Sequence, residues 1–188
     1  MAEILIIVAH PKREGFSFAI AETYRKLAEA RGESVELLDL YRCDHQQPFF
    51  SFENPNRPGE TEAMRFYQEK IARADELLFV FPYWWGSTPA ILKNFIDWNF
   101  SSGFAFKYVD SRPVGLLGGK RVRIITTTGA PWFYYFLTGA HRRLKNMWKE
   151  QIVEFCGMEL EHFTVFGGMD GSAKRTDAIL QSIVRRFG

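Results

Sequence analysis

The sequence predicts an α/β protein in which five parallel strands form one sheet that helices cover on both faces. Continuous apolar runs, of which Ile4–Val8 is the clearest, are typical of strands buried on both faces. A segment of helical length and amphipathic pattern follows each of these runs. Because strands and helices alternate along the whole chain, the strands are expected to be parallel and joined by right-handed crossovers.

The first part of the chain contains three expected strands and three expected helices. Gly32 ends the first helix, and Pro89 stands where the third begins, which are the preferred places of these residues. A polar stretch rich in proline, residues 41–60, is expected to be a long loop. The strands are Ile4–Val8, Val35–Leu40 and Leu77–Phe81, and the helices are Ser17–Ala30, Glu60–Ala74 and Ala90–Phe100.

The rest of the chain adds two strands and two helices. The strands are Val122–Thr127 and Leu160–Phe166, and the helices are 139–156, closed by Gly157, and Ala173–Phe187. The sequence has no internal repeat and no stretch typical of a linker between domains. Its 188 residues suit a single domain, so we expect one domain over residues 1–188.

Charge and aromatic content indicate which partners the chain favours. The net charge of +2 gives no general support to nucleic-acid binding. A local basic cluster of Arg142, Arg143 and Lys145 is interpreted as a solvated helix face. Aromatic residues make up 16% of the chain, more than a core of this size needs, which indicates a stacking site, an oligomer interface, or both.

The two cysteines, Cys43 and Cys156, are too few for a disulfide scaffold, and no clustered ligands indicate a metal site. The short apolar run at the N-terminus lacks the basic start of a signal peptide. No apolar stretch reaches the roughly 18 residues that a membrane span requires. We therefore expect a cytoplasmic protein with reduced cysteines, no metal and no membrane segment.

Ligands of open parallel sheets bind outside the carboxyl ends of the strands, so the loops at residues 9–18, 82–89 and 128–141 are expected to carry function. The first loop leads into a helix N-terminus, whose free N–H groups and dipole suit an anion. Ser17 can cap this helix or donate to a phosphate, and His10 can donate from the strand end. The pattern Gly-x-x-x-x-Gly-Lys-Ser/Thr does not occur, which argues against a nucleoside triphosphatase. The dinucleotide pattern Gly-x-Gly-x-x-Gly is also missing after the first strand.

The second loop carries Trp84 and Trp85 directly after a buried strand. Two adjacent indoles are hard to bury in a loop, and a planar heterocycle is a natural partner for them. A hydrophobic plug or a dimer contact remains the alternative.

The third loop begins with small residues that let a ligand approach the backbone, Thr127, Thr128 and Gly129. Tyr135 and His141 follow, and their side chains can donate hydrogen bonds to developing negative charge. The alternative for His141 is an ordinary structural role.

Together these loops resemble the flavodoxin-like NAD(P)H:quinone oxidoreductase family, the DT-diaphorase-like group, over nearly the whole chain. The most specific matches are Phe81-Pro-x-x-Trp85 running into Pro89-Ala90-Ile91-Leu92-Lys93, and Thr127-Thr128-Gly129 followed by Tyr135 and His141. His10 with Phe16-Ser17 matches the family's phosphate loop, and Gly103-Phe104-Ala105-Phe106-x-Tyr108 matches the segment that closes over its active site. The family often has a second glycine at the place of Ala130, and Gln or Met at that of Trp84.

The resemblance implies a flavodoxin-like three-layer sandwich with a five-stranded parallel sheet in the order 2-1-3-4-5, and a flavin across the strand ends. FMN is favoured over FAD, because the chain has one phosphate-type loop and lacks the mammalian-type C-terminal extension. The phosphate is expected at His10, Gly15, Phe16, Ser17 and Phe18. The isoalloxazine is expected against Pro82, Tyr83, Trp84, Trp85 and Gly86, with Thr127, Thr128 and Gly129 along its other edge.

The resemblance also implies an activity. NAD(P)H would deliver hydride to the flavin and leave, and a quinone-like acceptor would then take the hydride in a ping-pong cycle. Tyr135 and His141 would act in catalysis by stabilising the negative charge that reduction creates. Phe106, Tyr108 and Trp132 would wall the acceptor pocket, in part from the second subunit of a homodimer.

Two other functions stay open. A flavodoxin-type electron carrier is one, although such carriers are usually strongly acidic and this chain carries +2. A flavin-binding regulatory subunit of a membrane transporter is the other. A receiver domain of the same fold is excluded, because it needs acidic residues where this chain has Ala9-His10-Pro11. The sequence identifies neither the acceptor nor the choice between NADH and NADPH.

Overall fold

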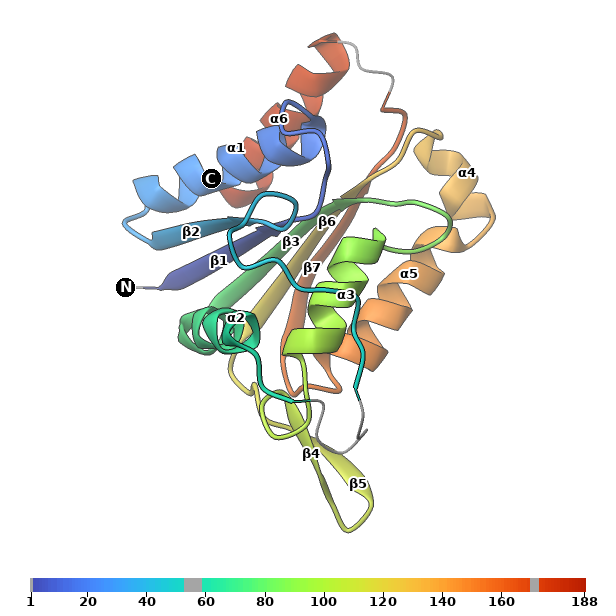
Figure 1. Cartoon of the computed structure of the whole chain (residues 1–188). Coiled ribbons are helices and arrows are strands. Elements are labelled where there is room, and N and C mark those ends of the chain that lie inside the picture. Colours follow the sequence, from blue (N-terminus) through green and yellow to red (C-terminus); the bar gives the residue numbers. More distant parts are fainter. Residues whose placement is uncertain (1, 53–58, 170–172) are drawn as a thin grey trace.

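The computed structural model describes residues 2–52, 59–169 and 173–188, without the side chains of residues 132 and 173–175. Five strands form the main sheet: β1 (Glu3–Val8), β2 (Ser34–Asp39), β3 (Glu76–Pro82), β6 (Arg121–Thr127) and β7 (Glu159–Phe166). All neighbouring strands in it are parallel, and their order is β2-β1-β3-β6-β7 (Figure 1). The predicted order 2-1-3-4-5 is not matched as numbered, because two strands that the prediction missed precede β6.

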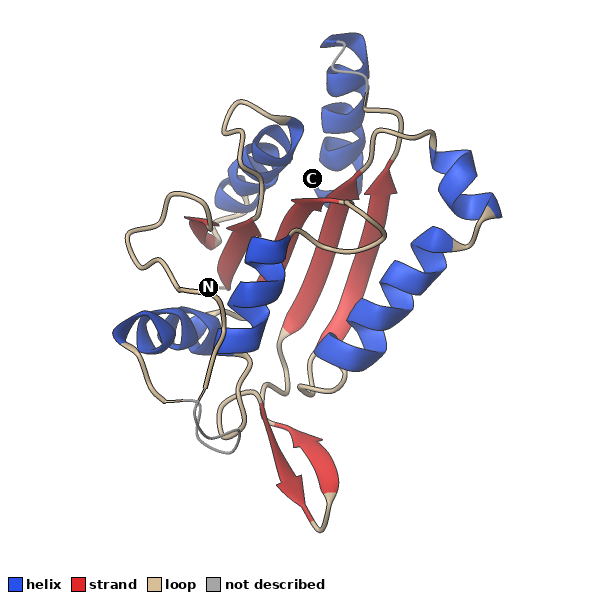
Figure 2. Ribbon diagram, turned by 45° about the vertical axis from the view of Figure 1, so that its right-hand side comes forward, coloured by secondary structure: helices blue, strands red, loops and turns tan. Residues whose placement is uncertain are grey.

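Helices lie on both faces of this sheet (Figure 2). They are α1 (Phe16–Ala30), α2 (Glu62–Arg73), α3 (Ala90–Asn99), α4 (Trp132–Leu137), α5 (Ala140–Trp148), a π-helical turn η1 (Lys149–Val153) and α6 (Ala173–Phe187). One apolar core joins α1 and α6 to the sheet, and a second core joins α2, α3 and α5 to its other face. The predicted three-layer α/β architecture with a five-stranded parallel sheet is therefore confirmed.

The central strands supply both cores, as their unbroken apolar runs predict. In β1, Ile4 and Ile6 pack toward α1 and α6, whereas Leu5 and Ile7 pack toward α2 and α3. All of these side chains are buried, with no more than 2% of their surface exposed. Burial on this scale is the main favourable contribution to folding.

The helix predicted over 139–156 corresponds to α5 and η1, which together run from Ala140 to Val153, but the short helix before them was not predicted. The structure has the short helix α4 before Gly139, whose left-handed conformation (φ +68°) separates it from α5. Residues 149–153 then widen into a π-helical turn before the chain leaves the helix. Glycine adopts positive φ at little cost, so Gly139 can supply this break between two helical segments.

An antiparallel hairpin that the sequence analysis missed extends from the end of the molecule opposite the carboxyl ends of the sheet (Figure 1). It consists of β4 (Phe106–Val109) and β5 (Arg112–Gly115). Its base rests on the chain after η1, where an ideal Cβ on Gly115 would lie 2.1 Å from the Gly157 nitrogen. Leu117 N also donates a hydrogen bond to Cys156 O at 2.9 Å. Only glycine at position 115 permits this contact between the two backbones.

A buried group of charged residues lies between the sheet and the helices α1 and α6. Glu76, at the start of β3, is 1% exposed, and the Tyr24 hydroxyl of α1 donates a hydrogen bond to it. Arg123 of β6 donates to the Tyr24 hydroxyl and lies 3.5 Å from the Glu76 carboxylate, while Arg121 lies 3.6 Å from it. Burial, followed by the hydrogen bond with Glu76, raises the pKa of Tyr24. The tyrosine therefore stays protonated and available as a donor.

Candidate active site

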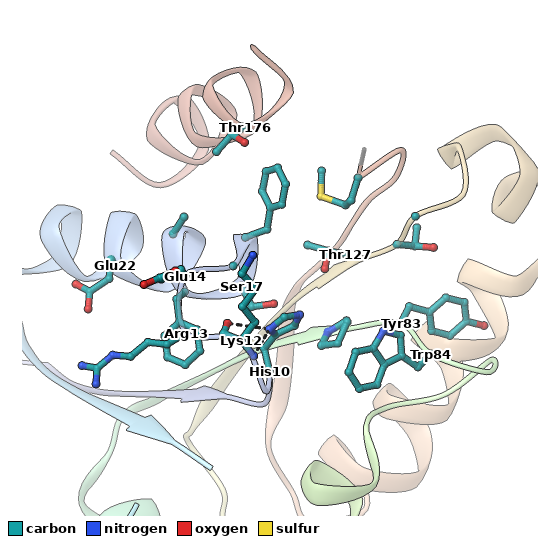
Figure 3. Close-up of a pocket in the computed structure, with 18 residues that line it drawn as sticks. His10, Lys12, Arg13, Glu14, Ser17, Glu22, Tyr83, Trp84, Thr127 and Thr176 are labelled. Carbon is teal, nitrogen blue, oxygen red and sulfur yellow. Dashed lines mark hydrogen bonds between the residues drawn. The ribbon is translucent and has the colours of Figure 1, made fainter. Parts of the chain in front are cut away.

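A cavity of about 700 Å³ opens at the carboxyl ends of β1, β3 and β6 (Figure 3). The three loops singled out in the sequence all contribute to its wall. The residues of the predicted flavin site that line it are His10, Gly15, Phe16, Ser17, Phe18, Pro82, Tyr83, Trp84, Thr127, Thr128 and Gly129. Its volume lies within the range of roughly 300 to 1,000 Å³ that is usual for small-molecule sites.

The first loop turns tightly before α1. A Cβ on Gly15 would lie 3.1 Å from the Lys12 carbonyl oxygen and 3.2 Å from the His10 ring, so a side chain at this position would displace the loop. Gly15 is also the N-cap of α1, and within the described part of the chain no side chain caps this helix end. The alternative that Ser17 caps the helix is therefore wrong, and the first N–H groups of α1 remain available to a ligand.

The Ser17 hydroxyl is the most informative group in the cavity. Ser17 is 1% exposed, and its Oγ has no hydrogen-bond partner among the described residues. Burying a hydroxyl without a partner costs about 1 to 3 kcal/mol, so such groups are rare, and Ser17 differs from the buried, unpaired Thr126 hydroxyl in lining the cavity. The hydroxyl belongs to the first turn of α1 and lines the cavity, as an anion-binding group would (Figure 3).

Other side chains hold this loop or add positive charge to it. His10 Nδ1 lies 2.9 Å from Lys12 O and 3.1 Å from Lys12 N, which fixes the ring against the loop backbone. Arg42, which pairs with Asp39 at 2.9 Å, donates a hydrogen bond to the Pro11 carbonyl from outside the cavity. Lys12 and Arg13 line the cavity together with the carboxylates of Glu14 and Glu22, so the lining offers two cations that can contact an anion at the loop.

The second loop is only partly inside the cavity. Trp84 lies with its ring centroid 6.0 Å from that of His10, and 41% of its surface is exposed. Trp85 is fully exposed and has a positive φ of 50°, in a turn that two hydrogen bonds close between Trp84 and Ser87. Trp85 and Gly86 are not among the residues that line the cavity in this structure.

The third loop is tied to the second by its backbone. Tyr83 N donates a hydrogen bond to Thr127 O at 2.7 Å, and Thr128 N donates to Phe166 O at 2.9 Å. Thr127 and Thr128 are buried, whereas an added Cβ on Gly129 would meet no heavy atom within 4 Å. The loop therefore presents a fixed wall with open space beside Gly129.

The structure separates the two predicted catalytic residues from this cavity. Tyr135 and His141 line a second cavity of about 510 Å³. The two cavities are neighbours, because the rings of Tyr83 and Tyr135 are in contact with centroids 5.1 Å apart. His141 Nδ1 lies 3.1 Å from the Tyr135 carbonyl oxygen.

The predicted acceptor-pocket residues do not line the first cavity within one chain either. Phe106 and Tyr108 belong to β4, at the opposite end of the molecule. Trp132 begins α4, but its side chain lies outside the part of the structure that is described.

Several lining residues were missed by the sequence analysis. They are Lys12, Arg13, Glu14, Ala19, Glu22, Met169 and Thr176. The two cations carried a usable signal, since basic residues in a loop before a helix favour phosphate. Met169 and Thr176 carried none, because only folding brings the chain after β7 beside α1.

Among the described residues, no helix is long and apolar enough to cross a membrane. The same residues contain no group of three or more His, Cys, Asp or Glu side chains that could hold a metal ion.

Comparison with known proteins identifies the family. A family model described as the flavodoxin-like fold matches residues 2–187. An FMN-dependent NADH:quinone oxidoreductase of Caldicellulosiruptor bescii is 34% identical over 170 residues, which cover 85% of this chain and 83% of that protein. An uncharacterized NAD(P)H oxidoreductase of Haemophilus influenzae is 33% identical over 167 residues, with coverages of 87% and 82%.

Solved structures agree on the fold. An NAD(P)H:quinone oxidoreductase from Methanothermobacter marburgensis matches with a TM-score of 0.84 at 23% identity, over 98% of this chain and 96% of that one. At this identity the match shows the fold alone. With the family model and the curated relatives, it leads to one conclusion: the chain belongs to the flavodoxin-like family, in its group of NAD(P)H:quinone oxidoreductases.

Proposed function

We propose that this protein is an FMN-dependent NAD(P)H:quinone oxidoreductase whose single domain, residues 1–188, transfers hydride from a reduced nicotinamide to a quinone-like acceptor. The unpaired Ser17 hydroxyl at the N-terminus of α1 carries the proposal, because it marks a site for an anionic group. The names of the relatives support the cofactor and the reaction. They favour neither the electron carrier nor the transporter subunit.

The residues in the cavity fit FMN. Its phosphate would accept hydrogen bonds from Ser17 and from the first N–H groups of α1, with Lys12 and Arg13 close by. His10, Gly15, Phe16 and Phe18 would complete this end of the site. The isoalloxazine would lie against Pro82, Tyr83 and Trp84, with Thr127, Thr128 and Gly129 along its edge. Trp85 and Gly86 stay predicted ligands that the cavity in this structure does not include.

When bound, the flavin supplies a two-electron carrier between the nicotinamide and the acceptor. The protein would orient it and exclude water from one side, because Thr127 and Thr128 are buried in the wall. Tyr135 and His141 are proposed as donors to the charge that reduction creates. Tyr135 contacts Tyr83, whose hydroxyl pKa is raised chiefly by burial, so Tyr83 stays a neutral part of the wall between the two groups.

Purified protein is expected to be yellow and to contain one FMN per chain. Addition of NADH or NADPH without oxygen should bleach the flavin absorbance, and addition of 1,4-benzoquinone should restore it. A colourless protein that takes up no FMN would contradict the proposal. Release of FAD would contradict only the choice of cofactor. Bleaching that a quinone does not reverse would instead favour an electron carrier.

A homodimer is part of the proposal, with the hairpin of each copy beside the site of the other. The hairpin carries exposed apolar side chains, including Tyr108 (61% exposed) and Val109 (45%). The site end carries a second exposed set, Trp84, Trp85, Phe133, Tyr134, Phe136 and Leu137. In a two-fold dimer each set can cover the other, and Phe106 and Tyr108 then reach a site that they do not reach within one chain.

Sedimentation velocity at micromolar concentration is expected to show a dimer, and Tyr108→Asp is expected to shift it toward the monomer. A carboxylate buried against apolar side chains is costly, whereas on an exposed hairpin it is harmless. A monomeric wild-type protein would overturn this part of the proposal.

The unpaired Cys43 and Cys156 favour a reducing compartment, and we propose the cytoplasm.

A further inference from the structure

The second cavity, of about 510 Å³, lies beside α5 and the edge strand β7. Arg142, Lys145 and Asn146 of α5 line it, together with Phe163 of β7 and the proposed catalytic pair. Its volume is in the range of small-molecule sites, and nothing in the hydride transfer itself requires most of these residues. The cavity therefore has a chemical character that the proposed reaction does not yet explain.

That character is cationic on one side. Arg142 and Lys145 stand three residues apart and so share a face of α5. Within the described part of the chain, neither forms an ion pair, and no carboxylate lines the cavity. Arg143, by contrast, points elsewhere and donates a hydrogen bond to Thr138 O at 2.9 Å. The basic cluster thus places two of its three charges on a cavity rather than on a simple solvated face.

The other side of the cavity is aromatic. Tyr135, Phe136 and Phe163 all contribute to its lining. The rings of Phe136 and His141 are stacked, with centroids 5.4 Å apart and planes 16° apart. Cations and aromatic faces in one cavity match a nucleotide, which carries both phosphates and a planar base. A simple inorganic anion would contact the cations but would make no use of the aromatic side chains in the lining.

The position of the cavity indicates which nucleotide. It shares the wall of Tyr83 and Tyr135 with the candidate flavin cavity. A ligand bound across this wall would have one end at the flavin and the other beside α5. We propose that the second cavity binds the adenosine diphosphate half of NAD(P)H, with Arg142 and Lys145 on its phosphates. This inference rests on the proposed function, because it assigns the co-substrate of that reaction.

The test compares four holoenzymes with the wild type: Arg142→Gln, Lys145→Gln, the double variant, and Lys149→Gln as the control. Lys149 lies one turn further on, makes an exposed ion pair with Glu154 and does not line the cavity. The measurements are binding of 2′,5′-ADP by calorimetry, and KM and kcat for NADH and NADPH with benzoquinone. Loss of each charged contact is expected to weaken 2′,5′-ADP binding and raise KM about tenfold, at unchanged kcat and FMN content.

A higher KM for NADPH alone would support contact with the 2′-phosphate. An equal rise in KM for NADH and NADPH would support contact with the pyrophosphate. Binding of 2′,5′-ADP that is unchanged in the double variant would overturn the inference, as would an equal loss in Lys149→Gln. These failures are distinct from failure of the proposed function, which would show as a wild-type protein that never reduces a quinone.

Discussion

Replacing Ser17 by alanine is expected to stabilise the flavin-free protein and to weaken FMN binding. Without a ligand, the buried hydroxyl has no hydrogen-bond partner, so its removal should raise the free energy of unfolding by about 1 kcal/mol. With FMN bound, the same hydroxyl would donate to a charged phosphate. Loss of such a bond costs about 1.5 to 3 kcal/mol, which corresponds to a Kd raised roughly tenfold to a hundredfold.

Thr126→Val is a matched control for this experiment. The Thr126 hydroxyl is also buried and unpaired, but Thr126 does not line the flavin cavity. Valine has nearly the same shape, so the variant should gain similar stability and keep the wild-type Kd for FMN. Urea unfolding of the apoproteins and titration of FMN fluorescence give the two quantities. If Ser17→Ala binds FMN as tightly as Thr126→Val does, Ser17 is not a phosphate ligand.

Arg123→Gln is expected to destabilise the protein by about 3 to 5 kcal/mol, because it leaves the buried Glu76 carboxylate without its nearest cation. Arg123 also pairs with Glu161 at 2.9 Å and lies over the rings of Tyr24 and Phe187. Arg121 remains near Glu76, but its own side chain is 42% exposed and its nitrogen is 3.6 Å away. It should therefore compensate only in part.

Two further variants test whether the unpaired Glu76 carboxylate causes the destabilisation expected for Arg123→Gln. Lys93→Gln removes an exposed ion pair with Asp97 and should change the unfolding free energy by less than about 1 kcal/mol. Adding Glu76→Gln to Arg123→Gln removes the buried charge itself and should recover part of the lost stability. Urea unfolding at one pH measures all of these effects. A double variant less stable than Arg123→Gln alone would show that an unpaired carboxylate is not the cause.

Much of the fold could be predicted from the sequence, because its main signals are strong and local. The apolar run of β1 is typical of a strand buried on both faces, and the alternation with amphipathic segments then favours parallel strands. The hairpin had no comparable signal. Phe106–Val109 and Arg112–Gly115 are four residues each, largely exposed, and the second contains a proline. Such strands are stabilised by their anchorage on Gly157, which no local pattern reveals.

In the candidate site, too, some residues could be predicted from local sequence signals and others could not. Parallel topology brings three loops to one edge, so most of the predicted residues directly after the strands line the first cavity, whereas Trp85 and Gly86 do not. Tyr135 lies within α4, a helix that the sequence analysis did not predict, and His141 follows this helix in α5. Whether they face the first or the second cavity depends on the break at Gly139. The role of Arg142 and Lys145 depends on which face of α5 meets β7, which charge spacing alone does not determine.

The seating of the hairpin on Gly157 has a consequence for assembly. The backbone contact at Gly115 and the hydrogen bond from Leu117 N to Cys156 O anchor the hairpin at its base within its own chain. Its conformational entropy is thus largely lost during folding rather than at the encounter of two copies. Docking into a partner would then cost mainly rigid-body freedom, so a modest apolar contact at the tip can suffice for a lasting complex.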